Sequence, residues 1–147
     1  MPSSKHQIFL SYSAEDAFEA ELLQYAIEQL LSGLGVSVWT YHRDQRRDER
    51  SIGSSLKERI RASIATIFLV SPSTVRSGAT QWMELAYSDA YAVPTFVILH
   101  RLTFADLTSR HKGIPPLLLE SQCSVSAEWK EVIDELRNRV MSLNSSG

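Results

Sequence analysis

The fold class that the sequence predicts is α/β: an open, doubly wound sheet of five parallel strands with helices on both faces. Short runs rich in β-branched and large apolar residues alternate with longer stretches whose apolar residues recur at helical spacing. This strand-then-helix order repeats five times, with no internal boundary. Right-handed crossovers between successive strands then give a flavodoxin-like strand order.

Four strands are clear from the pattern, and a fifth is shorter. The clear strands run over Ile8 to Tyr12, Val36 to Thr40, Thr66 to Val70 and Thr95 to Leu99. The third and fourth are almost continuously apolar, which is typical of parallel strands covered on both faces. A short edge strand is expected over Gln122 to Val125.

The first helix lies between the first two strands. Its apolar stripe consists of Leu23, Ala26, Ile27, Leu30, Leu31 and Leu34. Ser13 with Asp16 three residues later resembles a capping box that opens this helix, and Gly33 or Gly35 closes it.

Three further helices follow the second, third and fifth strands. Their apolar stripes are Leu56, Ile60 and Ile64, then Trp82, Leu85, Ala86 and Ala90, then Trp129, Val132, Ile133, Leu136, Val140 and Leu143. The middle one of these helices is expected to end before Pro94. On its helical wheel Glu84 lies opposite Trp82 and Ala86, so its side chain is expected to face solvent or a cleft.

Composition bounds the class of protein. The chain has 147 residues, of which 44% are apolar and 22% charged, with a formal net charge of -2. We expect a single domain over residues 1–147, with a core of about 7–143 and a tail or linker start at 144–147. The charge near zero gives no field that attracts nucleic acid or an anionic membrane. No apolar run is long enough to span a bilayer, so a cytoplasmic location is expected.

The sequence lacks the motifs of several common sites. Cys123 stands alone and four scattered histidines offer no paired ligand spacing, which disfavours a zinc site or a disulfide framework. No glycine-rich phosphate loop follows a strand, and no G-x-S-x-G marks a nucleophilic serine. The third strand ends in Ser71-Pro72-Ser73, where a phospho-acceptor domain needs an aspartate.

In a doubly wound sheet, ligands bind at the carboxyl ends of the strands, near the point where the strand order reverses. The residues expected there are Ser11 to Ser13, Trp39 to Asp44, Ser71 to Ser73, and the loop leading into Trp82 and Glu84.

These segments also resemble those of a known protein family. They are similar to the motifs of the Toll/interleukin receptor (TIR) domain family, in the family's order and spacing. The matching segments are Ile8 to Ser13, Gly35 to Trp39, Arg43-Asp44 with Ile52-Gly53 and Leu56, Ile64 to Ser71, and Trp82 to Leu85.

TIR domains are either signalling adaptors or enzymes that cleave NAD⁺ at the nicotinamide-ribosyl bond. The resemblance implies an NAD⁺ nucleosidase of the prokaryotic type, hydrolase or cyclase, with a role in immunity or antiviral, anti-phage defence. NAD⁺ is then the substrate, and no further cofactor is expected. The family's essential glutamate corresponds to Glu84. A carboxylate in the first turn of a helix is also favourable through the helix dipole alone, which is the structural alternative for Glu84.

Substrate contacts are expected from residues around the strand ends, namely Tyr12, Ser13, Trp39, Tyr41, Asp44 and Trp82. The aromatic rings could stack on the pyridinium or adenine ring, although tryptophans more often serve packing. The resemblance also implies an assembly loop that docks on a neighbouring TIR domain, with Arg43, Arg46, Arg47, Ile52 and Gly53. Its mixed charges are equally typical of a solvated loop.

Two alternatives to the NAD⁺ nucleosidase stay open. One is a non-enzymatic adaptor that acts through contacts between TIR domains, over Tyr41 to Gly53. The other is an enzyme of the same fold that acts on free nucleosides. As partners, the sequence leads us to expect other TIR domains in an oligomer or filament, and a fused or separate sensor.

Overall fold

The computed structural model describes residues 6–40, 52–77, 79–103, 105, 124–126 and 129–146. Its strands form one sheet in the order β2-β1-β3-β4-β5, with every neighbouring pair parallel. Their bounds are β1 (His6–Ser11), β2 (Val36–Trp39), β3 (Ala65–Val70), β4 (Thr95–Leu99) and β5 (Ser124–Ser126). The flavodoxin-like α/β fold is thus confirmed. The edge strand β5 has only three residues and pairs with β4 over Phe96–Ile98.

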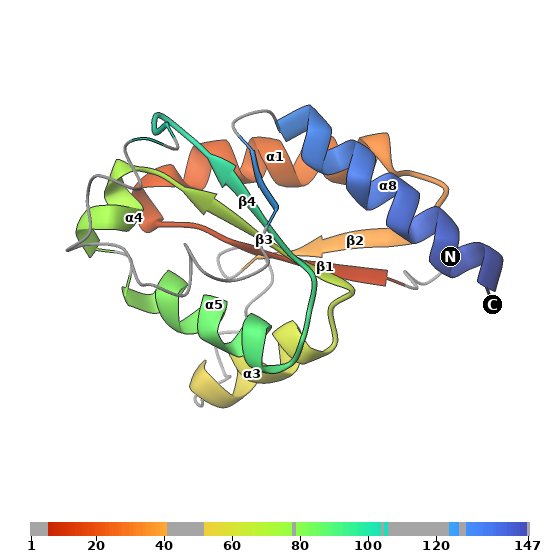
Figure 1. Cartoon of the computed structure of the whole chain (residues 1–147), viewed down its shortest axis with the longest axis horizontal. Helices are drawn as coiled ribbons and strands as arrows, with labels where there is room; N and C mark the ends of the chain where they lie inside the picture. The colour runs from red at the N-terminus through yellow and green to blue at the C-terminus, as the bar shows by residue number, and fades with distance from the viewer. Residues whose placement is uncertain are drawn as a thin grey trace.

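Helices lie on both faces of the sheet (Figure 1). α1 (Ala17–Leu30) and α8 (Trp129–Ser146) cover one face, while α3 (Ile52–Arg61) and α5 (Ala79–Ala90) cover the other. A 3-10 turn, η1 (Ala14–Asp16), leads from β1 into α1, and a short helix, α4 (Pro72–Ser77), follows β3. None of the described helices is long and apolar enough to cross a membrane.

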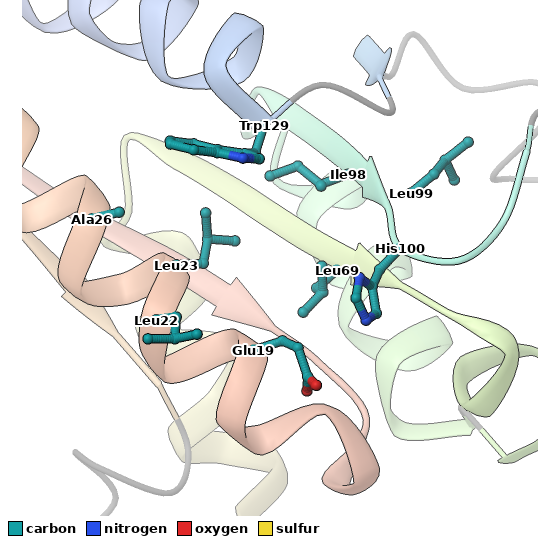
Figure 2. Close-up of a pocket in the computed structure, with 9 residues that line it drawn as sticks. All are labelled: Glu19, Leu22, Leu23, Ala26, Leu69, Ile98, Leu99, His100 and Trp129. Carbon is teal, nitrogen blue, oxygen red and sulfur yellow. The ribbon is translucent and has the colours of Figure 1, made fainter.

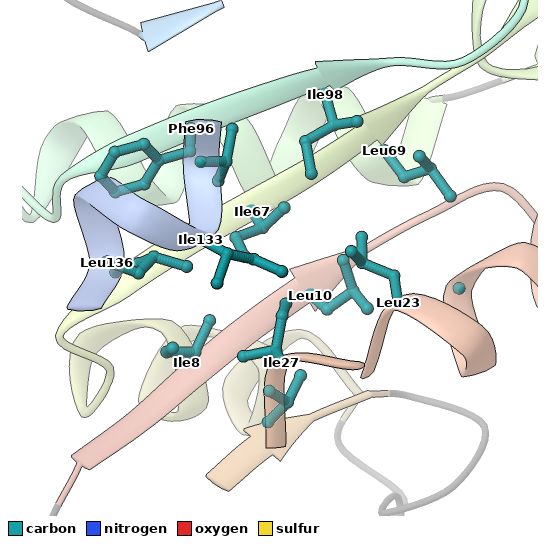
Figure 3. Packing of buried hydrophobic residues seen from close by; sticks show 14 of the residues in the cluster. Ile8, Leu10, Leu23, Ile27, Ile67, Leu69, Phe96, Ile98, Ile133 and Leu136 are labelled. Carbon is teal, nitrogen blue, oxygen red and sulfur yellow. The ribbon is translucent and has the colours of Figure 1, made fainter. Parts of the chain in front are cut away.

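The hydrophobic core lies in two layers because side chains alternate along each strand. On β1, Ile8 and Leu10 face α1 and α8, whereas Phe9 and Ser11 face α3 and α5. The first layer is the larger, and strand and helix side chains interlock in it (Figure 3). Its members from α1 and α8 are Ala20, Leu23, Ile27, Val132, Ile133 and Leu136, and Leu31 joins them directly after α1.

The beginning of α1 differs from the prediction. Ser13 makes no side-chain capping hydrogen bond there, and its hydroxyl pairs with that of Ser73. The Asp16 carboxylate accepts a hydrogen bond from the Ser71 hydroxyl instead of turning back on its own helix. The capping box predicted at Ser13 and Asp16 is therefore wrong, because both side chains bond to the segment after β3. Gly33 and Gly35 both have positive φ in the turn after α1, as a helix-closing role requires.

A helix begins instead after Ser71, where the sequence analysis predicted the end of the third strand. The Ser71 amide donates to the Thr74 hydroxyl at 3.1 Å, and the Thr74 amide donates to the Ser71 hydroxyl at 3.4 Å. This reciprocal pair is a capping box, and Pro72 occupies the first helical position, where its missing N–H costs nothing. The sequence Ser-Pro-Ser-Thr was the available signal for α4.

The buried face of α5 also differs from the prediction. Ala86 and Ala90 are exposed, while Gln81, Glu84 and Ser88 are buried beside Leu85. The predicted stripe over Trp82, Leu85, Ala86 and Ala90 is therefore rotated from the true one. Apolar residues alone could not show this, because three polar side chains of α5 find hydrogen-bond partners on the strands they cover.

Candidate active site

Polar side chains gather at the carboxyl ends of β1 and β3, beside a largely apolar core. The buried members are Ser11, Asp16, Ser71, Ser73, Thr74, Gln81 and Glu84. They come from three places: the end of β1 with its following turn, the end of β3 with α4, and the buried face of α5. This is the edge at which ligands bind in doubly wound sheets.

Glu84 is held by Ser11. The Ser11 hydroxyl donates to Oε1 of Glu84 at 2.8 Å, and the two residues are 2% and 5% exposed. Burial raises the pKa of Glu84 from 4.5 to about 7, because the charged form loses its hydration, while the Ser11 hydrogen bond acts in the lowering direction. A carboxyl group poised near neutral pH at a ligand-binding edge is typical of a functional residue.

Hydrogen bonds fix α5 on the sheet one turn before Glu84 and one turn after it. One turn before it, the Gln81 amide donates to the carbonyl of Leu69 at 3.0 Å. One turn after it, the Ser88 hydroxyl donates to that of Thr66 at 3.0 Å. These bonds set the rotation of the helix, so the Glu84 carboxylate is presented to the end of β1 in a defined position.

A second set of hydrogen bonds joins the turn after β1 to the turn after β3. The Ser71 hydroxyl donates to Oδ2 of Asp16 at 2.5 Å, and the hydroxyls of Ser13 and Ser73 lie 2.5 Å apart. The four residues that make these bonds are buried or half-buried. The carboxyl ends of the neighbouring strands β1 and β3 are thereby cross-linked on the side of η1 as well as through α5.

The aromatic residues expected at the site occupy different surroundings. Trp39 is 5% exposed and stacks on Phe9 with ring centroids 5.2 Å apart, and the Arg59 guanidinium lies over its ring at 5.4 Å. Trp82 is half-buried against the layer of Phe68 and Leu85. Tyr12 is half-buried and packs against the core layer of α1 and α8, on the face of the sheet opposite Glu84.

Comparison with known proteins decides the family. Residues 8–137 match the TIR domain family. The chain is a TIR domain. Among curated proteins there is no match. Among the solved structures that share its fold is a 2-deoxyribosyltransferase from Leishmania mexicana, at 16% sequence identity and TM-score 0.68; the match covers 90% of this chain and 97% of that one. Another is a 2-deoxyribosyltransferase from Bacillus psychrosaccharolyticus, at 16% identity and TM-score 0.64; that match covers 86% of this chain and 90% of the other.

Several residues predicted for the site of this TIR domain lie outside the described residues: Tyr41, Arg43, Asp44, Arg46 and Arg47. Ile52 and Gly53 form the first turn of α3. Of the predicted residues that are described, Ser13 and Glu84 lie at the joined ends of β1 and β3, together with Ser11 and Ser71.

The sequence analysis did not assign Asp16 or Gln81 to the site of the TIR domain. Gln81, Glu84 and Ser88 are spaced three and four residues apart, so they lie on one side of a helix. That polar spacing was a usable signal for the buried face of α5. For Asp16 the sequence carried no such signal, because its partner Ser71 is 55 residues away.

Proposed function

We propose that this TIR domain is an NAD⁺ nucleosidase that cleaves the bond between nicotinamide and ribose, with Glu84 as the catalytic carboxylate. The observation that carries the proposal is the buried Ser11–Glu84 pair at the carboxyl end of the sheet. Glu84 is the sixth residue of α5, so it lies beyond the first turn, in which the helix dipole alone would favour a carboxylate. The family resemblance assigns the essential glutamate to this residue. The family includes NAD⁺-cleaving enzymes.

The reaction suits a single carboxylate. Nicotinamide leaves NAD⁺ as a neutral base, so the leaving group needs no proton, unlike that of an ordinary glycosidase with its two carboxyl groups. The ribose carbon becomes positively charged as the bond breaks. A fixed anion beside it stabilises the transition state more than the ground state, and does so strongly where water is excluded. Water or an adenine nitrogen then takes the ribosyl cation, giving a linear or a cyclic product.

Ionisation of Glu84 is therefore part of the proposed mechanism. The free protein holds this carboxyl at a pKa of about 7. The positively charged pyridinium ring of NAD⁺ favours the ionised form when it binds nearby. Because kcat/KM reports the ionisation of the free enzyme, we expect kcat/KM for NAD⁺ to rise with pH through about 7 and then to level off.

The roles of the surrounding residues follow from their places. Trp82 lies two residues before Glu84 on α5, and we propose that its exposed part contacts a ring of the substrate. Ser13, Tyr41 and Asp44 stay proposed substrate contacts on the basis of the resemblance. For Tyr12, which packs on the face of the sheet opposite Glu84, a packing role is favoured. For Trp39, the stacking on Phe9 supports packing as its main role.

TIR domains typically interact with other TIR domains. We propose that the single domain of residues 1–147 is switched on by such self-assembly, through the loop with Arg43, Arg46, Arg47, Ile52 and Gly53, as an effector in immune or anti-phage defence. A fused or separate sensor would supply the signal.

The test is nicotinamide release. The purified chain is incubated with NAD⁺ at high protein concentration, and nicotinamide and linear or cyclic ADP-ribose are measured by chromatography. Glu84→Gln keeps the shape and an oxygen that accepts from Ser11, but removes the charge; we expect a loss of about 10³-fold, as when a key transition-state interaction is deleted. Glu21→Gln, an exposed carboxylate on α1, is the matched control and keeps full activity.

Each other outcome points elsewhere. Activity that persists in Glu84→Gln excludes Glu84 as the catalytic group. No release under any assembling condition favours the adaptor. The shared fold of the two 2-deoxyribosyltransferases makes free deoxynucleosides the substrates to include in the same assay. Release of a free base from them, without cleavage of NAD⁺, favours the nucleoside alternative.

A further inference from the structure

Asp16 lies at the joined strand ends but has no role in the proposed reaction, and two other metal-ligating side chains meet it there. Asp16 of η1, Glu19 of α1 and His100, which directly follows β4, each offer a ligand atom, and these atoms all lie within 4.8 Å of one another. Asp16 is buried and the other two are half-buried. In Figure 2 the His100 ring extends from the end of β4 toward the Glu19 carboxylate on α1.

One carboxylate oxygen of the half-buried Glu19 lacks a hydrogen-bond partner among the described residues. This atom, Oε2, is itself buried. A buried polar atom without a partner is costly, and more so when it carries charge. A cation placed between Glu19 and His100 would remove this cost.

A hollow of about 410 Å³ opens beside the cluster, on the face of the sheet covered by α1 and α8. Glu19 and His100 form its polar end, and Leu22, Leu23, Ile98 and Trp129 line its apolar part (Figure 2). An ion held by the three side chains would keep a coordination position open toward this space. Three protein ligands plus an open position is the arrangement of reactive metal sites, whereas closed structural sites use four.

We propose that Asp16, Glu19 and His100 bind a divalent first-row transition-metal ion, for which Zn²⁺ is the probe. Imidazole is a preferred ligand of Zn²⁺ and its neighbours in the series, and carboxylates complete such sites. The Ser71 hydroxyl, which donates to Oδ2 of Asp16, holds this carboxylate in place, as outer-shell partners do at metal sites. Mg²⁺ and Ca²⁺ bind more weakly, because they prefer oxygen ligands only.

Metal binding requires a small contraction of the cluster. With metal–ligand bonds of about 2.1 Å in a tetrahedral site, ligand atoms lie about 3.4 Å apart. The Glu19 side chain is long and only half-buried, so rotation about its bonds can supply this movement. The ion then ties the first turn of α1, which follows β1, to the end of β4; in the sheet, β3 lies between β1 and β4.

The test is titration of the whole chain with Zn²⁺ by calorimetry, with Co²⁺ as a spectroscopic probe. We expect one ion per chain, a rise in Tm on saturation, and a visible Co²⁺ spectrum that changes on binding. Glu19→Gln and His100→Ala should each weaken binding at least tenfold. The matched controls are Glu21→Gln, on the exposed side of α1, and His6→Gln, which is remote on β1; both should bind as the unaltered chain does.

Equal Zn²⁺ affinity in Glu19→Gln, His100→Ala and the controls would overturn the proposal, since binding would then come from other surface groups. Absence of binding in the unaltered chain would overturn it as well. Circular dichroism of each variant without metal verifies that it is folded before it is titrated. The proposal does not depend on NAD⁺ cleavage: Glu84→Gln, which should lose that reaction, is expected to keep Zn²⁺ binding unchanged.

Discussion

The two helices that pack on opposite faces of the sheet, α1 and α5, bury different chemistry. α1 presents mainly apolar side chains to the strands, Ala20, Leu23 and Ile27. Its buried Gln24 donates to the carbonyl of Val38 at 2.8 Å. α5 presents Gln81, Glu84 and Ser88, and each of them meets a strand, or the end of one, through a hydrogen bond. Both helices are buried to a similar degree at these positions, so the difference lies in the contacts rather than in exposure.

The two layers therefore serve different purposes, one for stability and the other for positioning polar groups. Apolar burial is non-directional and supplies most of the stability. Hydrogen bonds between buried groups add little net free energy, but they demand a defined geometry. Glu84 even lowers the stability of the fold when it is ionised, as its raised pKa indicates. The α1 layer therefore stabilises the domain, while the α5 layer positions a destabilising group.

The largest expected effect tests the α1 layer. Ile27 is fully buried among the strand side chains of the first core layer (Figure 3). Ile27→Ala removes buried methyl groups and leaves a cavity, so we expect a loss of about 3 kcal/mol in the free energy of unfolding, measured with urea. Tyr25→Ala, two residues earlier but 66% exposed, should change it by less than about 0.5 kcal/mol. Similar losses in both variants would contradict the division into layers.

The next effect tests the cost attributed to Glu84. Its pKa is about 7 in the folded chain and 4.5 in the unfolded one, so the folded state holds the proton more strongly between these values. Stability from this group is fully present below pH 4.5 and is lost as the pH rises through about 7. The full change is about 3 kcal/mol. The free energy of unfolding should therefore fall more between pH 4 and pH 8 in the unaltered chain than in Glu84→Gln.

Other groups titrate between pH 4 and pH 8 as well, but their contributions are the same in the unaltered protein and in Glu84→Gln. The difference between the two stability profiles therefore reports Glu84 alone. Parallel pH profiles for the unaltered chain and Glu84→Gln would show that Glu84 has an ordinary pKa, and the proposed rise of activity through pH 7 would then lose its basis.

A smaller effect tests the contribution of the Ser11 hydroxyl to the pKa of Glu84. The Ser11 hydroxyl favours the ionised carboxylate, so Ser11→Ala should raise the pKa of Glu84 further. A hydrogen bond to a charged group is worth about 1.5 kcal/mol, which corresponds to about one pH unit. We expect the rising limb of kcat/KM for NAD⁺ to move up by that amount, with the plateau at high pH little changed. A fall in the plateau without a shift would assign Ser11 to substrate contact instead.

The apolar half of the molecule could be predicted from the sequence. Strand positions such as Ile67 and Phe96, and helix positions such as Ile27 and Leu136, follow from period and composition, since only their size and hydrophobicity matter. The order of the strands followed from the alternation of elements and the handedness of crossovers. Glu84 was found through the family resemblance.

The polar half was harder because a polar side chain on a helix looks the same in sequence whether it faces water or a buried partner. Glu84 was expected off the packed stripe, yet Ser11, 73 residues earlier, makes its burial possible. Asp16 was taken for a capping residue, while its partner is Ser71. Periodicity cannot show such pairs, since they depend on which strand ends meet in space.

The smallest effect tests whether the polar bonds of α5 hold its rotation. Ser88 is fully buried, and its hydroxyl bonds to those of Thr66 and Thr95 at 3.0 and 2.9 Å. Ser88→Ala fits the space and suits a helix, so only the bonds are lost; we expect about 1 kcal/mol less stability in urea unfolding. Ser32→Ala, on the exposed turn after α1, is the control and should be neutral. If α5 were held by apolar contacts alone, Ser88→Ala would match the control. The pKa of Glu84 would then owe nothing to the bonds that orient its helix.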